Sequence, residues 1–223
     1  MSIFAIGDLH LPLGIDKPMD IFGGRWENYV EKINKNWQNI VSHDDVVLLC
    51  GDLSWATYLD EATKDFEFLN NLPGKKILLK GNHDYWWTTI SKLNAFLDKN
   101  KFKDFVFLQN NSVLCDDVAI CGTRGWKSPF DKGFSNDDQK IYERELLRLR
   151  LSLDEGKSLS DNLIVMMHYP PDFEFYEILK EYNVKKCVFG HLHGESGWNN
   201  ATIDERDFLV SADYLRFSPL KIL

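Results

Sequence analysis

The stretch ILLKGNHD, residues 77–84, joins a short apolar run to a cluster of polar residues. Its first half is typical of a buried β-strand, and its second half is typical of a tight turn that begins at glycine. Four other places repeat the arrangement: IFAIGDLH (3–10), VVLLCGD (46–52), LIVMMHYPP (163–171) and CVFGHLHG (187–194). Because ligands collect at the carboxyl ends of strands in α/β sheets, these strand ends predict a binding or catalytic site.

Between these motifs, the chain alternates strand-like and helix-like patterns. Apolar residues at helical spacing predict helices from Trp26 to Ile40, Leu59 to Leu69 and Tyr142 to Leu153, and a fourth is expected over Trp86 to Leu97. Residues 12–24 look like a loop, and short strands are expected at 105–108, 112–115, 118–121, 208–212 and 220–223. Since no repeat or linker divides the chain, we expect one α/β domain over residues 1–223, with a mixed sheet or two packed sheets.

Composition and charge limit the classes of function. The chain has 223 residues, of which 44% are apolar, so we expect a sizeable core rather than disorder. Its 34 acidic and 26 basic residues give a formal net charge of −8, which argues against non-specific binding to long nucleic acids or anionic membranes. No apolar run is long enough to span a bilayer, and no secretion signal is visible. The four cysteines lie in apolar stretches without a CxxC pair, so we expect reduced core cysteines and a cytoplasmic protein.

The polar residues at the strand ends form a set of potential metal ligands. These are Asp8, His10, Asp52, Asn82, His168, His191 and His193. Mixed oxygen and nitrogen donors suit Mn²⁺, Fe or Zn²⁺ better than Ca²⁺. Seven ligands are too many for one tetrahedral site and fit two ions that share a bridge, for which the two oxygens of Asp52 are suited. His43, beside other polar residues, is expected to be an ordinary surface histidine.

Taken in order, the motifs resemble those of the calcineurin-like metallophosphoesterases. That family's pattern is Asp-x-His, Gly-Asp, Gly-Asn-His-Asp/Glu, His and Gly-His-x-His, and all five blocks occur here between residues 7 and 194. The resemblance implies a four-layer α/β/β/α sandwich of two mixed β-sheets flanked by helices. It also implies two metal ions, one held by Asp8, His10, Asp52 and His193, the other by Asp52, Asn82, His168 and His191.

The resemblance further implies a reaction. Two ions about 3.5–4 Å apart lower the pKa of a water that bridges them, so that hydroxide is available for in-line attack on a phosphate ester. The same ions neutralise charge that develops on the phosphoryl oxygens. His83 would face the substrate phosphate and, when protonated, stabilise the transition state or protonate the leaving oxygen. Asp84 would set the orientation or pKa of His83, with a structural turn cap as the alternative.

Two blocks distinguish the chain from one branch of that family. Protein serine/threonine phosphatases continue the second block as Gly-Asp-x-Val-Asp-Arg-Gly and end the third in glutamate. Here the second block continues as GDLSWA, residues 51–56, and Asp84 ends the third. The blocks at 168–171 and 190–194 look more like those of small bacterial phosphodiesterases and phosphatases.

Two other segments pair an arginine with a tryptophan: Arg25 with Trp26, and Arg124 with Trp126. Arginine can hold a phosphate through two parallel hydrogen bonds, and an aromatic ring can stack on a base. Arg25, Arg124 and Trp126 are therefore candidate substrate-binding residues, with core packing as the alternative for the tryptophans.

The expected function is hydrolysis of a small, soluble phosphate ester, with a phosphodiester or nucleotide favoured. A phosphomonoesterase or protein phosphatase of the same fold and a nuclease are alternatives. A catalytically silent metal-binding scaffold is another, but such a protein would be expected to lack a ligand or His83, and all are present.

Overall fold

Two five-stranded sheets form the centre of the described part of the chain. The structure, a computed structural model, describes residues 1–17, 19, 21, 23–194 and 205–223. The first sheet has the order β10-β1-β2-β3-β4, with strands Leu220–Lys221, Ile3–Ile6, Val46–Cys50, Lys75–Leu79 and Phe105–Leu108. The second has the order β5-β6-β7-β8-β9, with strands Val113–Cys115, Val118–Thr123, Asn162–Met167, Lys186–Phe189 and Asp207–Leu209. Both sheets are mixed, because β10 is antiparallel to β1 and β5 is antiparallel to β6, whereas the other neighbours are parallel.

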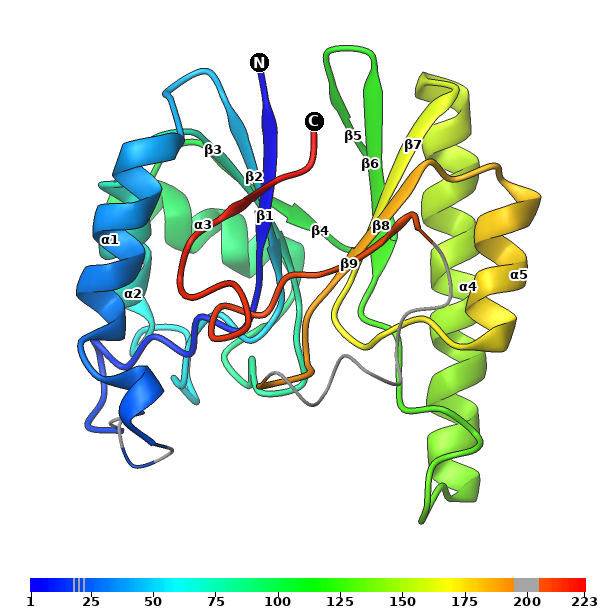
Figure 1. Cartoon of the computed structure of the whole chain (residues 1–223), viewed down its shortest axis with the longest axis horizontal. Helices are drawn as coiled ribbons and strands as arrows, with labels where there is room; N and C mark the ends of the chain where they lie inside the picture. Colours follow the sequence, from blue (N-terminus) through cyan, green and yellow to red (C-terminus); the bar gives the residue numbers. More distant parts are fainter. Residues whose placement is uncertain (18, 20, 22, 195–204) are drawn as a thin grey trace.

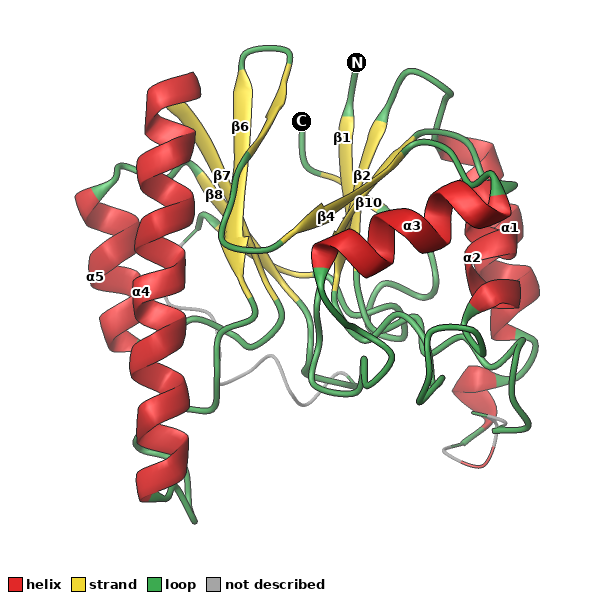
Figure 2. Cartoon of the chain, turned by 180° about the vertical axis from the view of Figure 1, so that it is seen from behind, coloured by secondary structure: helices red, strands yellow, loops and turns green. Residues whose placement is uncertain are grey.

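Helices cover the outer face of each sheet. On the side of the first sheet lie α1 (Tyr29–Ile40), α2 (Thr63–Asn70) and α3 (Ile90–Asn100); on the side of the second lie α4 (Asn136–Leu159) and α5 (Phe173–Glu181) (Figure 1). The view from behind shows the same layers, with the two sheets facing each other and the loops at the carboxyl ends of the parallel strands gathered below them (Figure 2). The expected four-layer α/β/β/α sandwich is therefore confirmed.

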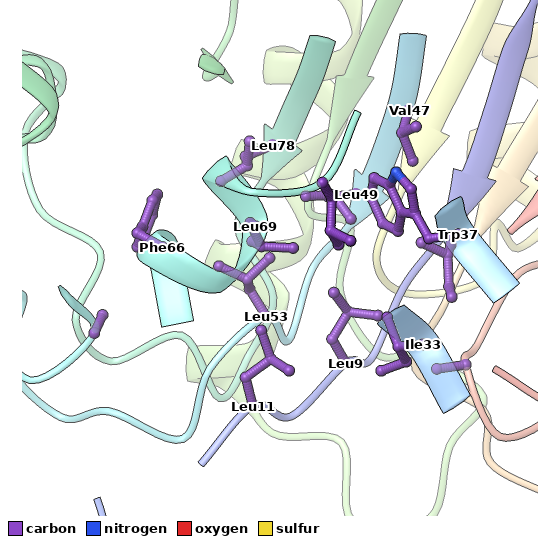
Figure 3. Close-up of a cluster of buried hydrophobic side chains, with 14 of the residues drawn as sticks. Leu9, Leu11, Ile33, Trp37, Val47, Leu49, Leu53, Phe66, Leu69 and Leu78 are labelled. Atoms are coloured by element: carbon purple, nitrogen blue, oxygen red, sulfur yellow. The ribbon is translucent and has the colours of Figure 1, made fainter. Parts of the chain in front are cut away.

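The alternation of side chains along each strand builds the layers. In β2, Val46, Leu48 and Cys50 pack between the two sheets, while Val47 and Leu49 pack against the helices of the first sheet. Strands that are buried on both faces in this way appear as continuous apolar runs in the sequence. Figure 3 shows the cluster between the first sheet and its helices, which includes these fully buried aromatic and aliphatic side chains: Leu11, Ile33, Trp37, Phe66 and Leu69.

Three predicted helices begin later than expected. The first begins at Tyr29 rather than Trp26, because Asn28 adopts a left-handed conformation (φ 53°) and Trp26 ends a separate 3₁₀ turn, Gly24–Trp26. The third begins at Ile90 rather than Trp86, where the side chain of Thr89 caps the first turn by accepting a hydrogen bond from the Lys92 backbone. The second begins at Thr63 rather than Leu59, because residues 59–62 form turns. In α1 and α3, a capping or turn residue rather than apolar spacing decides where the helix starts.

The two helices of the second sheet differ most from the sequence prediction. α4 extends well beyond the expected Tyr142–Leu153 segment, and a capping box formed by Ser135 and Asp138 fixes its start. α5, Phe173–Glu181, was not predicted. It follows Pro170-Pro171 and spans only nine residues, so its apolar pattern covers little more than two turns.

Other expectations can be compared directly with the structure. All four cysteines are buried and unpaired, as expected. Within the described residues, no helix is both long and apolar enough to cross a membrane. The expected loop over 12–24 falls partly outside the described residues, at positions 18, 20 and 22.

Candidate metal centre

The polar loops that follow the strands are aligned by backbone hydrogen bonds. In the first sheet, the backbone N–H of Asp8 donates to Gly51 O (2.9 Å) and that of His10 donates to Asp52 O (3.0 Å). The loops after β1 and β2 thus continue side by side beyond their strands. The loops after β7 and β8 are joined in the same way, because Gly190 N donates to His168 O (3.2 Å).

Glycines in these motifs let the backbone pass close to ligand side chains. A Cβ atom added at Gly81 would lie 2.1 Å from Asp52 Oδ1, and one added at Gly190 would lie 2.3 Å from Asp8 Oδ2. Both distances are far shorter than any van der Waals contact. The motif glycines are therefore needed for space at the site.

Several ligand candidates adopt strained backbone conformations. Asp8, His10, Asp52 and His191 have φ angles of 53°, 45°, 50° and 70°. Residues with a side chain seldom occupy this left-handed region, and such residues gather at functional sites, where surrounding contacts hold them. The loops therefore orient these side chains in backbone conformations that are locally unfavourable.

The seven candidate ligands converge on one region at the carboxyl ends of both sheets. Two groups bring one ligand atom from each residue within 4.8 Å of the others, namely Asp8, His10 and His193, and Asp8, Asp52 and His168. Asn82 joins the second group, since its Oδ1 lies 2.6 Å from His168 Nε2 and 3.0 Å from His191 Nδ1. All seven residues predicted as ligands are thus placed together.

Two of the histidines are oriented by a partner on the ring nitrogen that faces away from the cluster. Cys50 O lies 3.0 Å from His168 Nδ1, and Asp213 Oδ1 lies 3.0 Å from His193 Nδ1. Each contact leaves Nε2, which faces the cluster, with its lone pair available for a ligand bond.

Asp213 belongs to this arrangement, although it is not among the residues predicted from the sequence. It follows the β9 strand, and Gly7 N donates to Val210 O (2.7 Å), so its segment reaches the same edge as the other loops. Its position after an expected strand, residues 208–212, is the same signal that identified the other candidates.

A cavity of about 530 Å³ opens beside the cluster. His83 lines it together with His10, Arg25, Trp26 and Trp55, so the predicted phosphate-facing histidine does reach open space. The Trp55 ring stacks on His10 with centroids 4.4 Å apart and lies 5.1 Å from the ring of His83. Trp26 is 5% exposed and lines the same cavity, so it is both a core residue and part of the wall.

A family comparison agrees with this geometry. The model of the calcineurin-like phosphoesterases matches residues 1–195, most of the chain. The chain belongs to this family. It is a metal-dependent phosphoester hydrolase, as the sequence resemblance implied.

Solved structures share the fold of this phosphoesterase at low sequence identity. The phosphopantetheinyl hydrolase PptH from Mycobacterium tuberculosis is 14% identical, with a TM-score of 0.59, and the match covers 100% of this chain and 95% of that one. AQ665 from Aquifex aeolicus, a protein of unknown function, is 16% identical, with a TM-score of 0.55 and coverage of 99% and 95%. TT1561 from Thermus thermophilus is 13% identical, with a TM-score of 0.54 and coverage of 86% and 82%. No curated protein matches the chain significantly.

The chemistry of the phosphoesterase site fits the divalent metal ions that the family implies. Burial and the neighbouring Asp52 carboxylate raise the pKa of Asp8 well above its usual value, and burial also raises the pKa of Asp52. Burial lowers the pKa of His168 and of His191 to about 3, so both imidazoles are neutral and have a lone pair to offer. Nδ1 of His10 is buried and has no hydrogen-bond partner among the described residues. Buried carboxylates, neutral imidazoles and an unpartnered nitrogen are the features that a bound cation would satisfy.

We expect Asp213→Asn to weaken metal binding by about 10–100-fold, with a similar loss of phosphoesterase activity. The carboxylate holds His193 Nδ1 and also accepts a 2.9 Å hydrogen bond from Gly194 N. Metal titration of the variant, with the exposed Asp44→Asn as the matched control, measures this effect. A metal affinity within about twofold of the wild type would show that His193 does not depend on Asp213.

Asp84 lies beneath the site rather than on the cavity wall. Its carboxylate is fully buried and accepts hydrogen bonds from these five donors: the backbone N–H groups of Asp52 (2.9 Å), Leu53 (2.9 Å), Ser54 (3.4 Å) and Gly81 (2.7 Å), and Trp86 Nε1 (3.0 Å). Burial and Asp52 raise the pKa of Asp84 to about 7, against the opposing effect of the backbone donors. One carboxylate therefore ties the second metal-binding loop to the third, as a turn cap does.

We expect Asp84→Ala to destabilise the protein by about 2–4 kcal/mol, because several buried N–H groups lose their acceptor together. For a chain of this size the melting temperature would fall by roughly 5–15 °C. Thermal unfolding monitored by circular dichroism, compared with the exposed Asp44→Ala, tests this. An unchanged melting temperature together with lost activity would instead favour the direct effect on His83 that the sequence suggested.

The second arginine–tryptophan pair does not reach the cavity that His83 lines. Arg124 stacks on Trp126, with its guanidinium carbon 4.4 Å from the ring centroid, and Trp126 Nε1 donates to Asp138 Oδ1 (3.0 Å). Arg124 instead lines a second cavity, together with Lys80, Arg144 and Arg148. Of the three substrate-binding candidates, only Arg25 is placed on the wall of the cavity beside the metal centre.

Proposed function

We propose that the chain hydrolyses a small phosphodiester at a centre that holds two metal ions. The observation that carries this proposal is the position of Asp52. Its Oδ2 atom lies 3.9 Å from His10 Nε2 on one side and 3.4 Å from His168 Nε2 on the other. An oxygen between histidines of two separate ligand groups is the arrangement required of a bridging carboxylate.

The proposed ligand sets are those that the family resemblance implies, and the position of Asp52 supports them. Asp8, His10, Asp52 and His193 would hold one ion, and Asp52, Asn82, His168 and His191 would hold the other. Asp8 also lies within reach of the second group, which keeps the two sets compact. When bound, two divalent ions would lower the pKa of a water and offset charge on the phosphoryl oxygens. Mn²⁺, Fe²⁺ or Fe³⁺, and Zn²⁺ suit the carboxylate, amide and imidazole donors.

The residues of the chain position the ester for this reaction. Asp52 Oδ1 accepts a 2.7 Å hydrogen bond from His83 N, which fixes the backbone of the proposed acid relative to the bridging carboxylate. The ring of His83 faces the cavity, where it can donate a proton or hydrogen bond to an oxygen of the ester. Trp26 and Trp55 give that cavity aromatic walls that an apolar or flat part of the ester can contact, while Trp55 itself stacks on His10 and has Lys17 Nζ 3.5 Å from its ring centroid.

The charges at the cavity favour a diester over a monoester. Among the described residues that line the cavity, Arg25 is the one arginine. Its guanidinium lies 3.9 Å from Asp213, so part of the positive charge is already compensated. A doubly charged monoester would call for more positive charge than this wall supplies. The net charge of −8 supports a small substrate rather than a long nucleic acid, and a cytoplasmic location without a membrane partner is part of the same proposal.

The test is to remove the metal and then reload the protein with Mn²⁺, Fe²⁺, Zn²⁺ or Mg²⁺. Each form is assayed on bis-p-nitrophenyl phosphate and on p-nitrophenyl phosphate, while elemental analysis counts the ions bound per chain. A phosphopantetheinyl ester belongs in the substrate panel, because the similar Mycobacterium tuberculosis structure is that of a phosphopantetheinyl hydrolase.

The proposal expects two ions per chain and metal-dependent turnover that is faster on the diester. One ion at full activity would contradict the two-metal centre, and faster turnover of the monoester would contradict the diester preference. Two bound ions without turnover on any ester of the panel would favour the silent scaffold.

A further inference from the structure

A second cavity, of about 290 Å³, lies between the carboxyl ends of β3 and β6 and the helix α4. Four cationic side chains line it: Lys80, Arg124, Arg144 and Arg148. We call this cavity the arginine pocket. The remaining wall is mostly polar and includes Thr88, Gln109 and Asn110. Such a concentration of positive charge is unexpected in a chain whose net charge is −8.

One buried carboxylate compensates only part of this charge. Glu145 is 1% exposed and lies 2.7 Å from Arg148 Nη1, 3.7 Å from Arg124 Nη2 and 3.9 Å from Arg144 Nε. Its other oxygen accepts a 2.6 Å hydrogen bond from Thr123. A single arginine would suffice to pair a buried glutamate, so two arginines and a lysine exceed what Glu145 requires.

The side chain of Arg124 has a fixed orientation and an unused hydrogen-bond donor. Its guanidinium is stacked on Trp126 at 4.4 Å, which fixes the plane of its donors. Nε of Arg124 is buried and has no hydrogen-bond partner among the described residues. An arginine that is oriented in this way, yet has an unused buried donor, is suited to a planar or tetrahedral oxyanion.

The arginine pocket adjoins the metal centre through the backbone. Arg124 O accepts hydrogen bonds from His168 N (3.2 Å) and Tyr169 N (2.9 Å), and Lys80 directly precedes Gly81 and Asn82. The cavity lined by His83 borders the same ligand cluster through His10 and His193. A molecule whose ester lies at the metal centre therefore has an anion-binding cavity next to it that the reaction itself does not require.

We propose that the arginine pocket binds a phosphate group other than the one that is hydrolysed. One consequence would be that the preferred substrate is a phosphodiester carrying a second phosphate, and this consequence rests on the proposed function. The binding of phosphate itself stands on the pocket alone. A separate phosphate ion that occupies the pocket beside the substrate has the same chemistry, and the experiment distinguishes these two sources.

The first measurement is isothermal titration of the metal-loaded protein with inorganic phosphate. We expect two binding events in the wild type, one at the metal centre and one at the arginine pocket. Arg144→Gln with Arg148→Gln should weaken one of them at least about tenfold, while Asp52→Asn should remove the other. Arg150→Gln is the matched control, because it lies on the same helix and pairs with Glu181 outside the pocket.

A second variant guards against misfolding of the double mutant, since Arg148 is the nearest partner of the buried Glu145. Arg144→Gln alone loses only a 3.9 Å ion pair from a half-exposed side chain and should still weaken phosphate binding. Phosphate binding that is unchanged in both the single and the double variant would overturn the proposal. Because this readout does not involve turnover, its failure is distinct from a failure of the proposed hydrolysis.

The second measurement identifies the source of the phosphate. It compares the KM of thymidine 5′-(p-nitrophenyl phosphate) with that of its 3′-phosphorylated analogue, which has the same reacting ester. A KM about tenfold lower for the analogue in the wild type, but not in Arg144→Gln, assigns the pocket to the substrate. Equal KM values, with the arginine-dependent phosphate event still present, assign it to a separate phosphate ion and overturn the consequence for substrate choice.

Discussion

Asp52→Asn is expected to lower phosphodiesterase activity at least about 10³-fold, or about 4 kcal/mol in the activation free energy. The substitution keeps the size of the side chain but removes its negative charge and one oxygen acceptor. That oxygen, Oδ2, is the atom that lies between His10 and His168. If it bridges two ions, both bind more weakly without it, because each loses an anionic ligand.

The two oxygens of Asp52 allow this loss to be separated from misfolding. Oδ1 accepts the hydrogen bond from His83 N, and an asparagine oxygen can take over that contact. The variant should therefore keep the fold, as measured by circular dichroism, while elemental analysis shows fewer than two ions per chain. Asp98→Asn, on the exposed face of α3, is the matched control and should retain both ions and activity. Two tightly bound ions in Asp52→Asn would exclude a bridging role for this carboxylate.

The α/β class and the ligand cluster could be predicted from local patterns, whereas the four-layer sandwich was implied by the family resemblance. Apolar runs such as Val46–Cys50 are long enough only for strands, and the turn-forming glycine after most of these runs marks where the strand ends. Once the strands are parallel neighbours, their ends meet at one edge. Polar residues that follow strands of one sheet, such as Asp8 and Asp52, are thereby brought together, and the packing of the two sheets then adds His193, which follows β8.

Features that depend on tertiary contacts were harder to predict. Asp213 follows an expected strand, but its contact with His193, 20 residues away in the sequence, is not visible in any local pattern. The role of Asp84 was left open between catalysis and turn capping, because a sequence does not show which N–H groups surround a carboxylate. The arginine pocket combines residues from two sheets and a helix, and only Arg124 was singled out among them.

His83→Ala tests whether this histidine acts on the ester rather than on the metals. We expect kcat to fall by about 10²–10⁴-fold with both ions still bound, because His83 lies outside the ligand groups and its ring has no hydrogen bond to the described residues. His43→Ala, at an exposed histidine of the same chain, is the matched control. A loss below about fivefold would show that His83 is not needed for the chemical step.

The leaving group then distinguishes the two roles proposed for His83. A p-nitrophenolate leaves readily without a proton, whereas an alkoxide needs one, so a general acid matters far more for an alkyl ester. If His83 protonates the leaving oxygen, His83→Ala should impair hydrolysis of an alkyl phosphodiester much more than that of bis-p-nitrophenyl phosphate. If it stabilises charge on the phosphoryl group, the two losses should be similar, and His83→Asn, which retains a hydrogen-bond donor, should recover part of each. We expect the first result, because the ring of His83 lines an open cavity in which it can reach a leaving oxygen.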